Sequence, residues 1–170
     1  EVRHTKFTSV SWARDASGFY YSAYPDGDDH LQAVVCWHRI GSRQEEDTEV
    51  YAVRDHDTRV PYATVTHDGL YLVITLDEGT MSNGIVAIAL DGSQRVVPVA
   101  TRYDGIYQYL GSREGIGTEL LLRTTAGAPR GRVVAMDLSY GVSGQEIPQR
   151  VVVPEGPDVI QYAALVGDQV

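Results

Sequence analysis

The sequence of 170 residues contains one cysteine, one lysine and no long hydrophobic run. The single cysteine, Cys36, excludes an internal disulfide, and its apolar surroundings (AVVCWHR) indicate a small buried side chain rather than a nucleophile. No apolar stretch approaches the ~18 residues of a membrane-spanning helix. The other basic residues are arginines spread singly and the net charge is −9, so we expect neither nucleic acid nor a membrane as a partner.

Catalytic motifs are also lacking. There is no glycine-rich phosphate loop and no dinucleotide fingerprint. The glycine- and serine-containing spots at residues 111–115 and 141–144 have no neighbouring helix pattern, which a nucleophile elbow requires, so we interpret both as turns. We therefore expect no catalytic residue and no cofactor in this chain.

The five histidines share no metal-ligand spacing. Residues 26–30 (DGDDH) supply only part of the oxygen ligands of a calcium loop, and residues 55–57 (DHD) make at most a small acidic site. We interpret both segments as solvated loops, and no metal site is expected.

Strand-forming patterns dominate the sequence, with Gly or Asp-Gly punctuating them about every 8–12 residues. Hairpin patterns begin at residues 7, 63 and 106, and each is followed by a polar loop and two further strands. The fourth strands of the second and third units echo each other as QRVVPVA and QRVVVPE. Four strands at a period of about 40–50 residues predict the blades of a β-propeller. A plain β-sandwich is the alternative, which the regular spacing disfavours.

The predicted blades occupy residues 7–55, 63–100 and 106–155, and residues 159–166 are predicted to form the first strand of a further blade. Because a closed propeller has about 4–8 blades, the chain is expected to be an all-β arc of about three four-stranded antiparallel blades cut from a larger ring. Uncovered end blades would expose apolar faces, which predicts a homo-oligomer of the isolated chain. Trp12 is expected to be buried between blades.

Four segments, in order along the chain, resemble the propeller domain of the prolyl oligopeptidase family. The first and most specific is KFTSVSWARDASGFYYSAYP at residues 6–25. The others are DGLYLVITLDEG at residues 68–79, TTAGAPRGRVVAMDL at 124–138 and VVVPE at 151–155. Together they extend over most of the sequence.

This resemblance implies a serine peptidase of two domains that cleaves short peptides after proline. In that family a seven-bladed propeller limits access to an α/β-hydrolase domain with a Ser-Asp-His triad. The implied partners of this chain are therefore the catalytic domain, the remaining blades and short peptide substrates. Nothing in this chain matches the hydrolase domain, so no triad residue is assigned to it.

The resemblance also implies where substrate would lie. Loops between the second and third strands are expected to face the hydrolase domain, which includes residues 26–30 and 125–130. Some family members have an arginine that reaches the substrate cavity at the position of Asp77, so the charge here is reversed. The candidate residues facing the cavity are Asp77, Glu78 and Arg130.

Two functions remain open on the sequence alone. The first is a non-catalytic part of a prolyl-oligopeptidase-like enzyme, and the second is a non-enzymatic propeller that serves as a binding or scaffold module. A nucleophile elbow with a downstream Asp and His in the flanking sequence would identify the enzyme. The lack of disulfide pairs favours a cytoplasmic location, and a periplasmic or secreted protein is the alternative.

Overall fold

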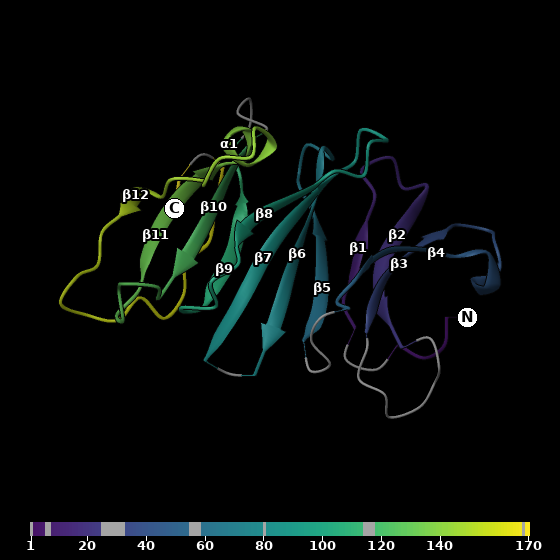
Figure 1. Ribbon diagram of the computed structural model, residues 1–170, viewed down its shortest axis with the longest axis horizontal. Coiled ribbons are helices and arrows are strands. Elements are labelled where there is room, and N and C mark those ends of the chain that lie inside the picture. Colours follow the sequence, from purple (N-terminus) through teal and green to yellow (C-terminus); the bar gives the residue numbers. More distant parts are fainter. Residues whose placement is uncertain are drawn as a thin grey trace.

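The fold consists of three four-stranded antiparallel sheets that lie side by side along the long axis of the molecule (Figure 1). The computed structural model describes residues 2–5, 8–24, 33–54, 59–79, 81–113, 118–167 and 169–170. In every sheet the strand order follows the chain, which confirms the predicted all-β propeller arc. The first sheet contains β1 (Val10–Trp12), β2 (Gly18–Ala23), β3 (Val34–Arg39) and β4 (Thr48–Ala52); the second β5 (Val60–Val65), β6 (Tyr71–Glu78), β7 (Ser82–Ala89) and β8 (Val96–Ala100); the third β9 (Tyr107–Ser112), β10 (Glu119–Thr124), β11 (Arg132–Asp137) and β12 (Arg150–Val153).

Aspartates shape the turns at the upper edge of Figure 1. Asp15, Asp68 and Asp91 each accept a hydrogen bond from the backbone N–H two residues later, at 2.9–3.0 Å. Such a carboxylate replaces a backbone acceptor and fixes a tight turn. The short helix α1 (Leu138–Val142), after β11, lies at the same edge, and the short helix η1 (Gln44–Glu46), between β3 and β4, lies at the right-hand end of the view near the N-terminus.

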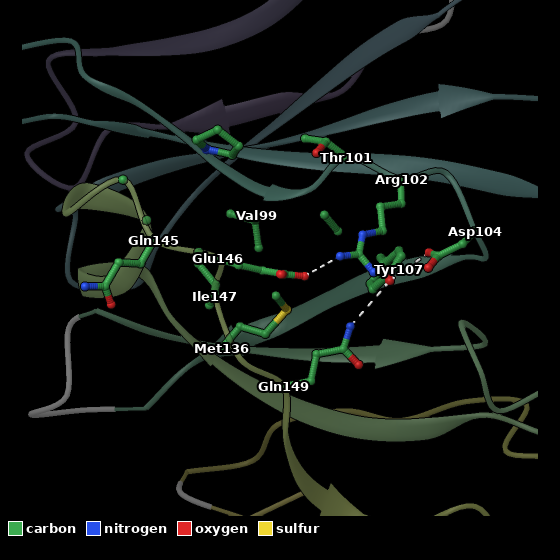
Figure 2. Close-up of a pocket in the computed structure, with 14 residues that line it drawn as sticks. Val99, Thr101, Arg102, Asp104, Tyr107, Met136, Gln145, Glu146, Ile147 and Gln149 are labelled. Carbon is green, nitrogen blue, oxygen red and sulfur yellow. Dashed lines mark hydrogen bonds and ion pairs between the residues drawn. The ribbon is translucent and has the colours of Figure 1, made fainter.

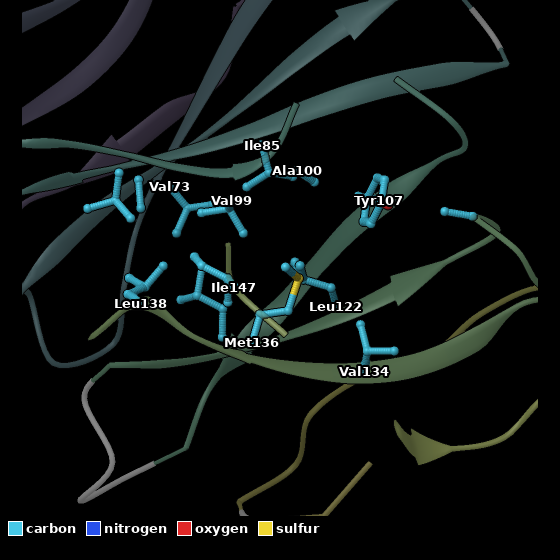
Figure 3. Packing of buried hydrophobic residues seen from close by; sticks show 14 residues of the cluster. Val73, Ile85, Val99, Ala100, Tyr107, Leu122, Val134, Met136, Leu138 and Ile147 are labelled. Atoms are coloured by element: carbon cyan, nitrogen blue, oxygen red, sulfur yellow. The ribbon is translucent and has the colours of Figure 1, made fainter. Parts of the chain in front are cut away.

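The middle sheet is buried on both faces, which accounts for the unbroken apolar run of β7. Residues at alternate positions of β6 and β7 point to opposite neighbours. Figure 3 shows the core toward the third sheet, where Val73 and Ile85 meet Leu122 and Met136. The opposite core, toward the first sheet, contains Tyr20, Val35, Leu72, Ile74 and Ile88.

The expected burial of Trp12 is wrong. Trp12 and Val10 lie on the side of β1 that faces away from the second sheet, and both side chains are 53% exposed. Ser11, between them, faces the second sheet instead, where its hydroxyl accepts a hydrogen bond from the Val65 N–H at 2.8 Å. The Trp12 ring packs edge-on against Phe19, with 5.3 Å between ring centroids.

Residues 159–166 differ from the strand expected of a further blade. Val166 forms an isolated bridge with Gln169, and the rest of this segment is irregular. Its backbone bonds to the third sheet instead. The Ile160 N–H donates to the Arg130 carbonyl at 2.7 Å, and the Arg123 Nε–H donates to the Ile160 carbonyl at 2.6 Å.

Candidate functional site

The turn between β6 and β7 lies at the lower edge of Figure 1, as does the loop between β10 and β11. The second and third strands of the middle sheet extend further than the sequence pattern indicates, because β6 and β7 pair as far as Glu78 with Ser82. Gly79 begins the turn with a φ of 73°, a left-handed conformation that favours glycine. The candidates Asp77 and Glu78 are therefore held on a strand rather than in a loop.

Asp77 lies between Val60 and Asn83 in the three-strand register of β5, β6 and β7. Directly paired residues of antiparallel strands point to the same side, so Asp77 shares with Asn83 the side that faces the third sheet. Its side chain is partly buried and has no hydrogen-bond or ion-pair partner within the described residues. Burial raises the pKa of the Asp77 carboxyl above its ordinary value.

Tyr62 is the aromatic neighbour of Asp77 on this side of the sheet. It pairs with Thr75, two positions along β6 from Asp77. Burial raises the pKa of the Tyr62 phenol, and the negative charge of Asp77 and the phenol of Tyr24 raise it further. The Tyr62 hydroxyl makes no hydrogen bond in the part of the chain that the structure describes.

Glu78 points to the opposite side of the sheet, where it is paired with Arg59. Its Oε2 accepts hydrogen bonds from Arg59 Nε at 3.2 Å and Nη2 at 3.1 Å. The Arg59 guanidinium also stacks on the Tyr103 ring, 3.8 Å from the centroid. Gly84 makes room for that ring, since a Cβ there would lie 2.8 Å from the Tyr103 hydroxyl. Glu78 is thus part of a structural cluster rather than an open carboxylate.

Arg130 lies in the β10–β11 loop of the third sheet, at the same edge as Asp77. Its side chain is exposed, while its backbone N–H donates to Glu155 at 2.6 Å. No contact among the described residues joins Arg130 to Asp77 or Glu78. The loops at residues 26–30 and 55–57, which the sequence analysis considered as ion sites, lie outside the described residues.

Asn83 joins the second and third sheets, a role that the sequence analysis missed. The side chain is buried, and its Nδ2 donates to the Tyr107 carbonyl at 2.8 Å while its Oδ1 accepts from the Tyr107 N–H at 2.6 Å. The amide therefore pairs with β9 as a neighbouring strand would. A single asparagine before a glycine carries no sequence signal for this arrangement.

A cavity of about 360 Å³ lies between the second and third sheets (Figure 2). Arg102 pairs with Glu146 at 2.5 Å, the Tyr107 hydroxyl donates to Asp104 at 2.9 Å, and Gln149 donates to the Tyr107 hydroxyl at 3.4 Å. These polar groups satisfy one another. The cavity thus differs from the surroundings of Asp77, where a carboxylate is left open.

One histidine–carboxylate pair resembles part of a catalytic triad. His38 Nδ1 lies 2.7 Å from Asp47 Oδ1, and Asp47 Oδ2 also accepts from the Tyr21 hydroxyl at 2.8 Å. No serine or cysteine is hydrogen-bonded to the other ring nitrogen within the described residues. Burial, followed by the charges of Asp47 and Glu49, raises the pKa of the Cys36 thiol to about 11, which suppresses thiolate formation. We interpret the pair as structural.

Two further features are absent from the described residues. None of their helices is both long and apolar enough to cross a membrane. No group of three or more His, Cys, Asp or Glu side chains among them could hold a metal ion.

The sequence is similar to known peptidases over most of its length. The family model of the prolyl oligopeptidase N-terminal β-propeller domain matches residues 1–169. Prolyl oligopeptidase A from Amanita bisporigera is 29% identical over 174 residues, which cover 92% of this chain and 22% of the relative. A prolyl endopeptidase from Elizabethkingia miricola is 29% identical over 136 residues, which cover 76% of this chain and 19% of the relative. The chain thus spans about a fifth of the length of these relatives.

Solved structures agree with this similarity. The apo structure of prolyl oligopeptidase B from Galerina marginata matches with a TM-score of 0.80 at 29% identity, covering 92% of this chain and 22% of that one. A solved prolyl endopeptidase matches with a TM-score of 0.85 at 25% identity, covering 98% of this chain and 24% of that one. The chain therefore belongs to the prolyl oligopeptidase family and forms part of its N-terminal β-propeller domain.

Proposed function

We propose that this chain is the non-catalytic, access-limiting part of a serine peptidase that cleaves short peptides on the carboxyl side of proline. The observation that carries the proposal is the continuity of the family match over residues 1–169. In one relative, prolyl oligopeptidase B from Galerina marginata, a solved structure holds a 35mer hydrolysis and macrocyclization substrate. A peptide is therefore the substrate class we assign to the intact protein.

The proposal places catalysis outside this chain. The described residues include a His–Asp pair, His38 with Asp47, but no nucleophile beside it, and the Cys36 thiol has a raised pKa. Acyl transfer requires a nucleophile within hydrogen-bond reach of its base. We expect the isolated chain to have no peptidase activity.

Limiting access requires sheets that stay together at their joints. Asn83 holds the backbone of β9 with two hydrogen bonds, and the Ser22 hydroxyl donates to the Pro61 carbonyl at 2.6 Å between the first and second sheets. Both contacts are buried, where a hydrogen bond is costly to break. We propose that these joints keep neighbouring blades from parting and so exclude large substrates.

The test uses the intact protein that carries this propeller. Proline-containing peptides of increasing length, and a folded protein with an exposed proline loop, are compared as substrates. We expect cleavage of the short peptides alone. Asn83→Ala removes the joint between the second and third sheets and should raise the cleavage rate of the longer peptides relative to the short ones. Gln108→Ala, on an exposed position of β9, is the control and should change neither rate.

Two results would contradict the proposal. An intact protein that cleaves no short peptide after proline would favour the scaffold alternative. An Asn83→Ala protein that folds and keeps the normal dependence on substrate length would remove the access-limiting role while leaving the peptidase assignment in place.

A further inference from the structure

The fold uses two tyrosine–aspartate pairs to hold its sheets. The Tyr21 hydroxyl donates to Asp47 at 2.8 Å in the first sheet, and the Tyr107 hydroxyl donates to Asp104 at 2.9 Å at the start of the third. In both pairs the phenol donates a hydrogen bond to the carboxylate, which is buried at Asp47 and exposed at Asp104. These pairs show how the molecule treats an aspartate that only supports structure.

Asp77 and Tyr62 are also a neighbouring aspartate and tyrosine, but no hydrogen bond joins them. They lie on the same side of the second sheet, two positions apart in register. Burial and then the charge of the Asp77 carboxylate raise the pKa of the Tyr62 phenol. Neither side chain makes a hydrogen bond within the described residues. A partly buried carboxylate without a partner is unfavourable for folding, so its retention points to a ligand.

The position of this pair suits a ligand that enters at the lower edge. Asp77 is the penultimate residue of β6, next to the β6–β7 turn, and Tyr62 lies on β5, the first strand of its sheet. Asn83, on the same side, is fully engaged with Tyr107, so it does not compete for a ligand beside Asp77. Glu78 is bound to Arg59 on the opposite side and does not contribute.

The chemistry of the pair selects a cation. A carboxylate attracts a positive charge more strongly where water is partly excluded, and a tyrosine offers both a hydroxyl acceptor and a ring face for an ammonium or guanidinium group. A metal ion would need more oxygen ligands than one carboxylate supplies, and no metal-binding group was found in the described residues.

We infer that Asp77 and Tyr62 form a subsite that binds a positively charged group of the peptide substrate, namely a lysine or arginine side chain or the amino terminus. This inference rests on the proposed function. It assigns Asp77 a role in substrate preference, not in bond cleavage.

The test compares matched peptides on the intact protein. Acetylated proline peptides with arginine at each of three positions before the proline are paired with their citrulline counterparts, which have the same shape without the charge. A third peptide with a free amino terminus distinguishes terminal from side-chain recognition. The wild type should prefer the charged member of at least one pair, chiefly through KM, and the preference should shrink in high salt.

Three variants locate the effect. Asp77→Asn should reduce the ratio of kcat/KM for charged over neutral peptide about five- to tenfold, as expected for loss of a partly buried ion pair. Asp77→Glu should restore part of the ratio. Asp91→Asn is the control, because it changes the net charge by the same amount at the opposite, upper edge and should leave the ratio unchanged. An asparagine side chain can still accept the hydrogen bond from the Ser93 N–H in that turn.

Failure of the inference and failure of the proposed function are distinguishable. Cleavage of the citrulline peptides after proline tests the proposed function without Asp77. If they are cleaved and the charge ratio is the same in wild type and Asp77→Asn, the subsite is overturned. If no peptide is cleaved, the proposed function fails, and the subsite is tested by calorimetric titration of the wild type with the same peptide pairs. Equal affinities for the charged and the neutral peptide would overturn the subsite.

Discussion

The two end sheets of the arc differ in the apolar side chains that their outer faces leave in solvent. On the third sheet, Leu121, Val133 and Ala135 point away from the middle sheet, yet all three are buried. Residues 159–166 cover them, and a Cβ at Gly111 would lie 2.8 Å from the Leu165 side chain. On the outer face of the first sheet, Tyr21, Ala23 and Val34 of β2 and β3 are also buried, but Val10 and Trp12 of β1 are half exposed.

This difference shows that an outer blade face does not need a complete neighbouring sheet to be covered. One irregular segment, anchored by hydrogen bonds to Arg123 and Arg130, is enough to bury the third sheet. The described residues that cover the first sheet are fewer. Residues 2–5 reach part of it. The Arg3 N–H donates to Gln44 at 2.8 Å, and Val2 packs against the buried cluster of Tyr21, Ala23 and Val34.

The largest effect is expected at the covered face. Leu121→Ala should lower the free energy of unfolding by about 3 kcal/mol, since it removes a fully buried side chain and leaves a cavity. Urea denaturation monitored by circular dichroism measures the change. Val10→Ala, on the outer face of the first sheet, is the control and should cost below about 1 kcal/mol. Equal losses at the two positions would contradict the comparison.

Loosening the cover itself should have an intermediate effect. Leu165→Ala removes a partly buried side chain of the covering segment and should cost about 1–2 kcal/mol. It should also speed amide hydrogen exchange in β10 and β11 more than in β2 and β3, which mass spectrometry resolves. Uniform exchange across all three sheets would mean that residues 159–166 do not protect the third sheet selectively.

A smaller loss of stability is expected at the open face. Trp12→Ala should cost about 1 kcal/mol, because half of the side chain is already in water and chiefly the contact with Phe19 is lost. The isolated 170-residue chain should self-associate through this face, and Trp12→Ala should weaken that association in sedimentation equilibrium. A wild-type chain that stays monomeric at about 100 μM would contradict self-association through the face that carries Trp12.

The smallest change in stability is expected at Asp77 in the middle sheet, away from the outer faces of both end sheets. The raised pKa of Asp77 means that the folded protein binds this proton more tightly than the unfolded chain does. The contribution of Asp77 to stability therefore falls as pH rises from about 3.9, the ordinary aspartate value, through the raised pKa. Asp77→Asn should remove this fall, so its free energy of unfolding should exceed that of the wild type at pH 7 but not at pH 3. A constant difference between pH 3 and 7 would assign the effect to packing.

The periodicity of the sequence was sufficient to predict three sheets of four strands, because each unit must repeat the same hairpin and turn chemistry. It could not predict the orientation of Trp12. Alternation places Trp12 and Val10 on one side of β1 but does not say which side meets the second sheet, since both sides of a propeller blade carry apolar residues. Ser11, which does face the second sheet, looks in the sequence like a solvent-facing position.

The candidate site was predictable only in part. Asp77 was singled out from its place in a family-like segment, and its state as an unpartnered carboxylate required the structure. The contacts of Arg59 with Glu78 and Tyr103, and of Asn83 with Tyr107, join residues 19–44 positions apart. No local pattern encodes such pairs, because they form only when strands from different parts of the chain are placed side by side.

The hydrogen bonds that join neighbouring sheets share one property, and this property affects how the sequences of the blades can diverge. Asn83, Ser11 and Ser22 each bond to peptide groups of the neighbouring sheet, not to its side chains. A neighbouring first strand can therefore alter its side chains without losing these bonds, provided that its backbone stays in place. Junctions of this kind tolerate duplication and divergence of whole repeats, so blades can acquire new surface chemistry while the ring that they build is inherited intact.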